Sequence, residues 1–136
     1  DPFGSWRQDS IQLAFDPMNS MRNDGTQYEY GISMRGSNGP ARWFCWIKGQ
    51  KNLDVMNPNS KLLIHRDEAH KQTIYLGVIA PEDIAPFSMA AKKEIGFDFC
   101  VNNSNGSQER EALEWTPGID TGSKDSSLFG LLRLQP

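Results

Sequence analysis

The sequence is short of cysteine, of long apolar runs and of positive charge, and each shortage narrows the class of protein. Its two cysteines permit one disulfide at most. No apolar run approaches the roughly 20 residues of a membrane-spanning helix. The net charge is −3, and the 14 lysines and arginines are scattered without forming a basic stripe. We therefore expect no membrane span and no nucleic-acid partner, since little of the chain could neutralise phosphates.

Signatures of catalysis are also absent. The two histidines, His65 and His70, form no zinc pattern, and no serine lies in a Gly-x-Ser-x-Gly turn. No glycine-rich phosphate loop follows a strand. No pair of carboxylates is singled out as the acid and nucleophile of glycoside cleavage. The sequence predicts a domain that is not an enzyme.

The cysteines leave two interpretations open. Cys45 and Cys100 fall in separate predicted strands, so a bridge across the sheets would be feasible. Two reduced, half-buried thiols fit the sequence at least as well. Cysteine usage therefore does not fix the redox compartment.

Alternation of apolar and polar residues is the main structural signal. At 136 residues, 38% of them hydrophobic, the chain is long enough for one domain with its own core. The period of two is that of half-buried strands, and Gly, Asn and Pro separate them. One short helical turn is predicted at Pro81–Ile84. The pattern predicts an all-β, antiparallel, jelly-roll-like β-sandwich. The predicted strands are 10–15, 28–34, 42–48, 61–66, 73–79, 95–101, 112–115 and 128–134.

Several segments resemble, in order, motifs of family 9 carbohydrate-binding modules. Residues 6–16 read Trp-x-x-Asp-Ser followed by a hydrophobic-polar strand, and 74–86 match a strand that leads into a short turn near proline. Residues 96–103 are similar to the family's Gly-Phe-x-hydrophobic-x-Val-Asn-Asp strand. Residues 113–134 hold a Trp-turn-Gly run, a Lys-Asp pair and an apolar last strand. The resemblance covers nearly the whole chain.

The resemblance implies a β-sandwich that binds polysaccharide or oligosaccharide and anchors a larger polysaccharide-active protein, such as a glycoside hydrolase, to glycan. It implies an extracellular or periplasmic location. Family members carry further N-terminal strands before the Trp-x-x-Asp-Ser motif, which starts here at Trp6. We therefore expect residues 1–136 to be a single domain that lacks those strands. Its other partners would be further segments of the same protein.

Sugar recognition needs an aromatic ring against the C–H face of the sugar and polar groups that bind its hydroxyls. Trp6 matches the first of two family tryptophans that sandwich the sugar, with a structural cap as the alternative role. Gln12 and Glu29 stand where the family carries a binding acid and a binding base. For Asn102 a turn role, and for Arg110 a surface ion pair, are the alternatives. The predicted sugar-binding residues are Trp6, Gln12, Glu29, Asn102, Arg110 and Trp115.

The second sandwich tryptophan is missing. The family places it just before the Lys-Asp pair, where this chain has residues 121–123, Thr-Gly-Ser. Trp43, Trp46 and Trp115 are the available substitutes. Trp43 and Trp46 point to opposite faces of their strand, so one is expected in the core and the other exposed. Trp115 is also compatible with a structural role. The departure indicates a changed ligand or a lost site, and a structural accessory domain without ligand is therefore an alternative function.

Two further ligands are considered. Structural calcium occurs in the family, and two polar loops carry oxygen ligands of the kind that calcium prefers, without a defined spacing. Haem is the alternative offered by related DOMON-like electron-transfer modules, which use methionine with histidine or lysine. The calcium candidates are Asp16, Asn19, Asn23 and Asp24 in one loop and Asn103, Asn105 and Glu109 in the other. The haem candidates are Met18, Met21, Met34, His65 and His70.

Overall fold

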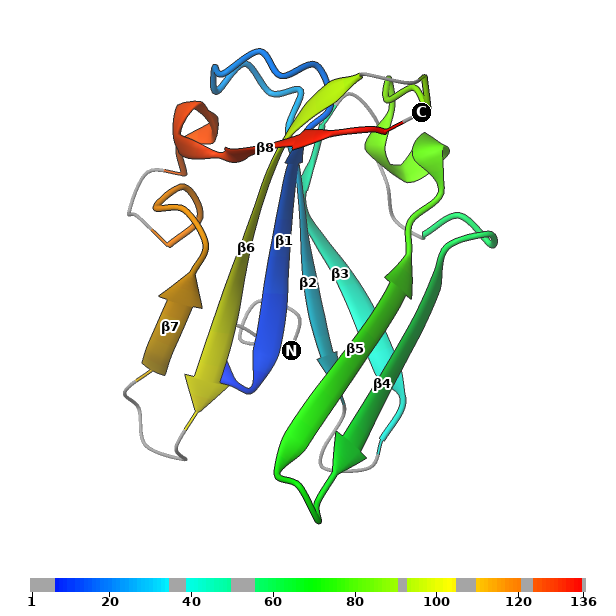
Figure 1. The fold of residues 1–136 in the computed structure, drawn as a ribbon, viewed down its shortest axis with the longest axis vertical. Coiled ribbons are helices and arrows are strands. Elements are labelled where there is room, and N and C mark those ends of the chain that lie inside the picture. The colour runs from blue at the N-terminus through cyan, green and yellow to red at the C-terminus, as the bar shows by residue number, and fades with distance from the viewer. Residues whose placement is uncertain are drawn as a thin grey trace.

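The computed structural model describes residues 7–34, 39–49, 56–90, 93–104, 110–120 and 124–135, apart from the side chains of Lys48 and Arg110. Two antiparallel sheets form a sandwich (Figure 1). The larger sheet has the order β3-β2-β1-β6-β7. Strand β8 pairs with the first residues of β6, along the same edge of β6 as β7. Its strands are β1 (Ser10–Asp16), β2 (Tyr28–Met34), β3 (Ala41–Lys48), β6 (Glu94–Ser104), β7 (Arg110–Glu114) and β8 (Gly130–Arg133).

The smaller sheet is a hairpin of β4 (Lys61–Asp67) and β5 (Gln72–Val78), which crosses in front of β3 in Figure 1. The described residues also include two short 3₁₀ helices, η2 (Pro81–Ile84) and η3 (Ser126–Leu128). The predicted all-β sandwich is confirmed, and so is the predicted short helical turn at Pro81–Ile84, whereas η3 is a second turn that was not predicted. No helix in the described parts of the chain is long and apolar enough to cross a membrane.

One face of the larger sheet holds the aromatic core. Phe15, Tyr28 and Tyr30 are buried there together with Ile84 and Ile95. The Tyr28 hydroxyl donates to the Ala85 carbonyl at 2.7 Å, and the Tyr30 hydroxyl donates to the Asp83 carbonyl. Buried hydroxyls need such partners, so these two bonds fix η2 against the sheet.

The opposite face of the larger sheet is polar and equally buried. Along β1 the polar residues Ser10 and Gln12 are 1% and 4% exposed, whereas the apolar Ile11 and Leu13 are only half-buried. Alternation predicted the apolar side as the inward one, and the structure encloses both. The physical reason is the segment after β7: Ile119 and Phe129 pack on this face against Ala14 and Cys100.

Apolar side chains remain exposed on the core side. Leu113 on β7 is 71% exposed and Trp115 is 46% exposed. The hairpin adds an outward row in which Leu63 pairs with Leu76, both more than half exposed. A two-stranded hairpin leaves the β6–β7 end of the larger sheet exposed, which is consistent with the prediction of further strands. That prediction stays untested.

The strand register decides between the two interpretations of the cysteines. Cys45 pairs with Tyr30 on the core face, whereas Cys100 pairs with Gln12 on the polar face, so the two thiols lie on opposite sides of one sheet and form no disulfide. The bridging interpretation is therefore wrong.

The last predicted strand, 128–134, is too long at its start, because β8 begins at Gly130.

Residues 126–128 form η3 because the Asp125 side chain accepts a hydrogen bond from the Ser127 N–H at 3.0 Å. An aspartate at this position caps the first turn of a helix.

Candidate functional site

The polar face brings two predicted residues together. Gln12 on β1 lies directly between Gly31 on β2 and Cys100 on β6. Its Nε2 donates to Oδ1 of Asn102 at 3.2 Å, and Asn102 Nδ2 donates to the Ser10 hydroxyl at 3.0 Å. Both residues are at least 96% buried, so this chain of hydrogen bonds fixes the orientation of the two side-chain amides.

A buried ion pair stands beside that chain. Glu29 pairs with Ala14 in the register and has a side chain only 3% exposed. Its Oε1 accepts a hydrogen bond from Lys124 Nζ at 2.6 Å, across 95 positions of sequence. Burial raises the pKa of the Glu29 carboxyl, and the attraction of Lys124 opposes that rise without cancelling it.

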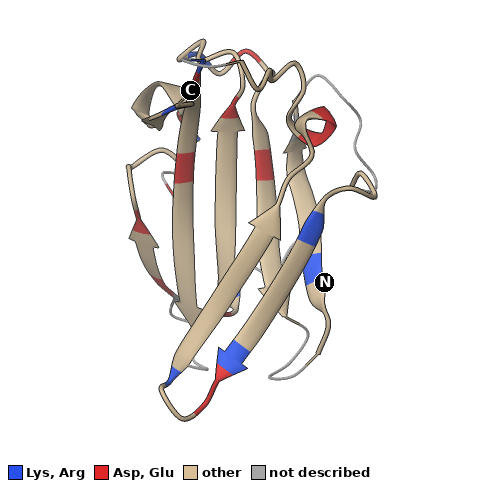
Figure 2. Cartoon of the chain, turned by 45° about the vertical axis from the view of Figure 1, so that its right-hand side comes forward, with Lys and Arg blue, Asp and Glu red and all other residues tan. Residues whose placement is uncertain are grey.

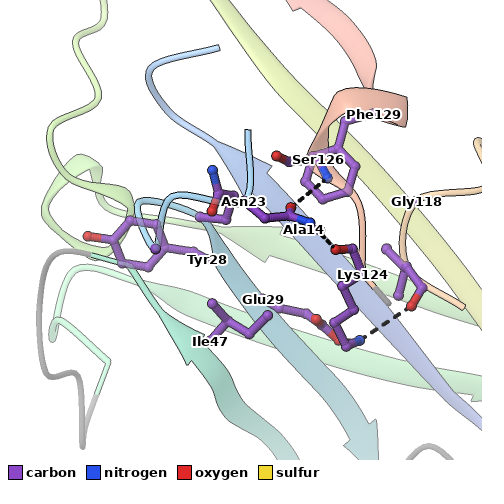
Figure 3. A pocket seen from close by; sticks show the side chains of 12 residues that line it. Ala14, Asn23, Tyr28, Glu29, Ile47, Gly118, Lys124, Ser126 and Phe129 are labelled. Atoms are coloured by element: carbon purple, nitrogen blue, oxygen red, sulfur yellow. Dashed lines mark hydrogen bonds and ion pairs between the residues drawn. The ribbon is translucent and has the colours of Figure 1, made fainter. Parts of the chain in front are cut away.

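Lys124 is held in position through its backbone. Asn23 Nδ2 donates to the Lys124 carbonyl at 2.6 Å, and Asn23 Oδ1 accepts from the Ser126 N–H at 3.0 Å (Figure 3). The Lys124 ammonium also lies 3.4 Å from the Ile119 carbonyl. Lys124 belongs to the Lys-Asp pair of the family resemblance, and its link to Glu29 was not predicted because nothing local in the sequence indicates it.

A cavity of about 230 Å³ opens at this ion pair (Figure 3). Its volume is below the roughly 300–1,000 Å³ of pockets for drug-sized ligands, so it suits one small group or ring. Apolar surface makes up most of its wall, and the polar groups come from Asn23, Gln27, Glu29, Lys124 and Ser126. The lining residues are Ala14, Asn23, Gly25, Gln27, Tyr28, Glu29, Ile47, Gly118, Ile119, Lys124, Ser126 and Phe129.

Trp46 supplies an aromatic ring on the same face. The register of β2 and β3 shifts between Glu29 and Tyr30, which places Trp46 at the irregularity, and its ring lies over Gly31. A Cβ on Gly31 would lie 2.5 Å from the ring, and glycine is therefore required for this close approach. Trp43 points to the core, where it packs edge-on against Tyr30. The expectation that the two tryptophans face opposite ways is confirmed.

Trp115 lies on the opposite face from this cavity, and its predicted role in sugar binding stays a prediction. Its ring packs against Phe97 and Phe99, with centroids 5.9 and 6.0 Å away. Those two phenylalanines alternate with the polar-face residues of β6, so Trp115 lies on the far side of the sheet from Gln12. The physical reason is parity: Glu114 takes the polar face and the next residue takes the core side.

Two other predicted residues cannot be placed. Trp6 and the side chain of Arg110 lie outside the described residues. Asp9, the aspartate of the Trp-x-x-Asp-Ser motif, bonds to the backbone: its Oδ1 accepts a hydrogen bond from the Ser104 N–H at 2.9 Å.

The calcium candidates of the first loop already have hydrogen-bond partners in that loop and at Ser126, and Ser20 donates to Asp16 Oδ2 at 3.2 Å. Asn23 is engaged with Lys124 and Ser126, and the Asp24 carboxylate accepts from the Thr26 N–H and hydroxyl. These hydrogen bonds lower the pKa of Asp24 to about 2. Within the described ranges no group of three or more His, Cys, Asp or Glu side chains could hold a metal ion. The second loop lies mostly outside the described residues, and calcium stays a prediction.

The haem candidates are spread over the molecule. Met18 and Met21 lie in the loop after β1 at one end of the sandwich, and His70 lies at the hairpin tip at the other end (Figure 1). Nδ1 of His70 lies 2.7 Å from the Asp67 carboxylate. Haem stays an untested alternative.

No family model and no curated protein matches the sequence. The solved structures that match nearly all of it include two of a family 9 carbohydrate-binding module from Caldicellulosiruptor kristjanssonii, one in complex with cellotriose and the other with glucose. The TM-scores are 0.66 and 0.63, with 16% and 15% identity over 96% of this chain. The chain has a family 9-like fold. It spans about 60% of the length of the family 9 chains that it matches.

Proposed function

We propose that this domain binds carbohydrate without catalysing a reaction, on the polar face of its larger sheet. The observation that carries the proposal is the cavity at the Glu29–Lys124 ion pair, on the same face of the sheet as the aromatic ring of Trp46. Support comes from the fold, because the matched family 9 modules are in complex with cellotriose and glucose.

The groups around the cavity suit sugar hydroxyls. A hydroxyl both donates and accepts, and the cavity offers a carboxylate acceptor in Glu29 and an ammonium donor in Lys124. Gln12 and Asn102 form a hydrogen-bonded base beside them. Trp46 takes the stacking role that the sequence analysis considered for it, in place of Trp115. Affinity should be modest, because each such bond replaces one to water and contributes about 1 kcal/mol.

The wider role follows from the same proposal. An accessory domain of this kind anchors a larger extracytoplasmic polysaccharide-active protein to its glycan and raises the effective concentration of substrate. The exposed Leu113 and Trp115 surface would then pack against further strands of that protein. Such a protein would contribute the catalysis that this domain lacks.

The test is calorimetric titration with cellotriose, followed by a glycan array. We expect binding that Trp46→Ala and Glu29→Gln each weaken at least about tenfold, with the fold retained by circular dichroism. Glu68→Gln at the hairpin tip is the matched charge control, and Trp115→Ala is the matched aromatic control; both should bind normally. Trp6→Ala tests the remaining predicted stacking residue. A folded protein that binds no glycan would instead support the structural accessory alternative.

A further inference from the structure

We propose that the cavity beside Glu29 takes the ammonium group of an amino sugar, so that the preferred ligand is a glucosamine-containing glycan. This inference rests on the proposed function and specifies its ligand class. The two sugars in the matched structures are neutral, and nothing in the fold alone favours a charged one.

The Glu29 carboxylate is the anchor of the argument. Its side chain is 3% exposed, whereas that of its partner Lys124 is 42% exposed. Lys124 engages Oε1, and no other described residue donates to the carboxylate. A buried carboxylate needs a cation close by. A half-exposed lysine ammonium, however, can give up its contact with the carboxylate and bind water instead. A ligand ammonium can therefore share the carboxylate with Lys124 or replace it.

The cavity wall supplies a second, independent feature. Ser126 is 3% exposed, and its hydroxyl oxygen has no hydrogen-bond partner among the described residues. Unpaired buried hydroxyls are uncommon because each costs about 1–3 kcal/mol relative to water. An ammonium has three donors, and this cavity offers acceptors in Glu29, Ser126 and the Ile119 carbonyl.

The charge around the cavity has the same sign as its anchor. Lys124 is the one cation among the lining residues. Among the sequence neighbours of lining residues, Asp24, Asp120 and Asp125 are acidic, and Arg22 and Lys48 are basic. Glu114 adds a further negative charge, since it accepts hydrogen bonds from the N–H groups of Ile119 in the wall and of Asp120 beside it. Acidic bands cross β1, β2 and β6, and basic ones mark the hairpin strand β4 (Figure 2). This field favours a cationic sugar and disfavours a uronic acid.

The experiment compares three trisaccharides by calorimetry in mildly acidic buffer: fully deacetylated chitotriose, its N-acetylated form and cellotriose. We expect the deacetylated sugar to bind at least about fivefold tighter than the other two, as one charge-assisted hydrogen bond would give. Glu29→Gln should remove this preference and leave weak binding of all three. Lys124→Met should increase the preference, because it removes the competing cation. Glu68→Gln should leave it unchanged.

The outcomes separate the two proposals. Binding of cellotriose with no preference for the deacetylated sugar overturns the amino-sugar inference and leaves carbohydrate binding intact. A preference that survives Glu29→Gln also overturns it, since general acidity would then be the cause. Absence of binding by all three sugars overturns both proposals. If Lys124→Met does not fold, Glu29→Gln decides alone.

Discussion

The contact between Gly31 and Trp46 makes the sharpest prediction about the polar face. Gly31 lies in the middle of β2, opposite Gln12, and its φ is not in the left-handed region. Alanine is therefore compatible with the backbone, and the only obstacle is space. A Cβ there would lie 2.5, 2.7 and 3.0 Å from three ring carbons of Trp46.

The size of the effect follows from those distances. Carbon atoms in contact lie about 3.5–4.0 Å apart, so the indole must move by about 1 Å in Gly31→Ala. Overpacking of this kind costs about 1–3 kcal/mol, and the stiffer unfolded chain offsets about 0.4–1 kcal/mol. We expect a net loss of about 1–2 kcal/mol in the free energy of unfolding, a Tm lower by roughly 4–8 °C.

Gly77→Ala is the matched control, because this glycine also lies in a strand and faces a tryptophan. Its Cβ would lie 3.5 Å from Trp43, an ordinary contact, so we expect stability within about 0.5 kcal/mol of the parent or slightly above it. Both variants are measured by urea titration and by calorimetric binding of cellotriose. Gly31→Ala should also weaken binding, since the ring moves.

A double-mutant cycle completes the test. Gly31→Ala in a Trp46→Ala background should cost little, because the ring that it strikes is gone. The reasoning fails if Gly31→Ala is as neutral as Gly77→Ala, or if its cost is unchanged when the ring is absent.

Three other predictions concern groups around the site. Burial raises the pKa of the Asp98 carboxyl, so the native state holds that proton more tightly than the unfolded chain does. The free energy of unfolding therefore falls as pH rises above the ordinary carboxyl pKa of 3.8. Asp98→Asn should gain stability relative to the parent between about pH 3 and about pH 7, as measured by urea titration. Asn23→Ala should cost about 0.5–1.5 kcal/mol in the same assay, because it removes both hydrogen bonds to the 124–126 segment. A reductant should leave the Tm unchanged, and a thiol reagent should label Cys45 before the fully buried Cys100.

The strands could be predicted from the sequence because their signal is local. In β2 the alternation of Tyr28, Tyr30 and Ile32 with polar or small residues marks both ends, and the structure has the same bounds. The end of the chain could not be predicted in this way. Leu128 continues an apolar pattern, but it lies in η3 because the Asp125 side chain caps that turn. One hydrogen bond there overrides the pattern.

The site was predictable only in part. Polarity and alternation placed Gln12 and Glu29 on one face, and the structure agrees. The partner of Glu29 is 95 positions away, and no spacing rule connects them. The choice among tryptophans required the register, since alternation gives a face within one strand and says nothing about which strands lie beside it. Only the pairing of Gly31 with Gln12 shows that the ring of Trp46, which lies over Gly31, is on the same face as Gln12.

A final prediction separates a pair kept for stability from one kept for a ligand. Lys124→Met alone leaves the Glu29 carboxylate buried without its cation, and should cost about 1–3 kcal/mol, less than for a fully buried pair because Lys124 is half exposed. Glu29→Gln with Lys124→Met removes both charges and replaces them with groups of similar size. Buried ion pairs replaced in this way are often neutral or stabilising.

We therefore expect the double variant to be at least as stable as the parent in urea titration, while it binds glycan at least about tenfold more weakly. A double variant as unstable as Lys124→Met would show that the pair holds the 124–126 segment in place. A double variant that binds normally would remove Glu29 and Lys124 from the site. A stable variant that does not bind would mean that a buried charge pair persists on this face because a sugar is recognised there.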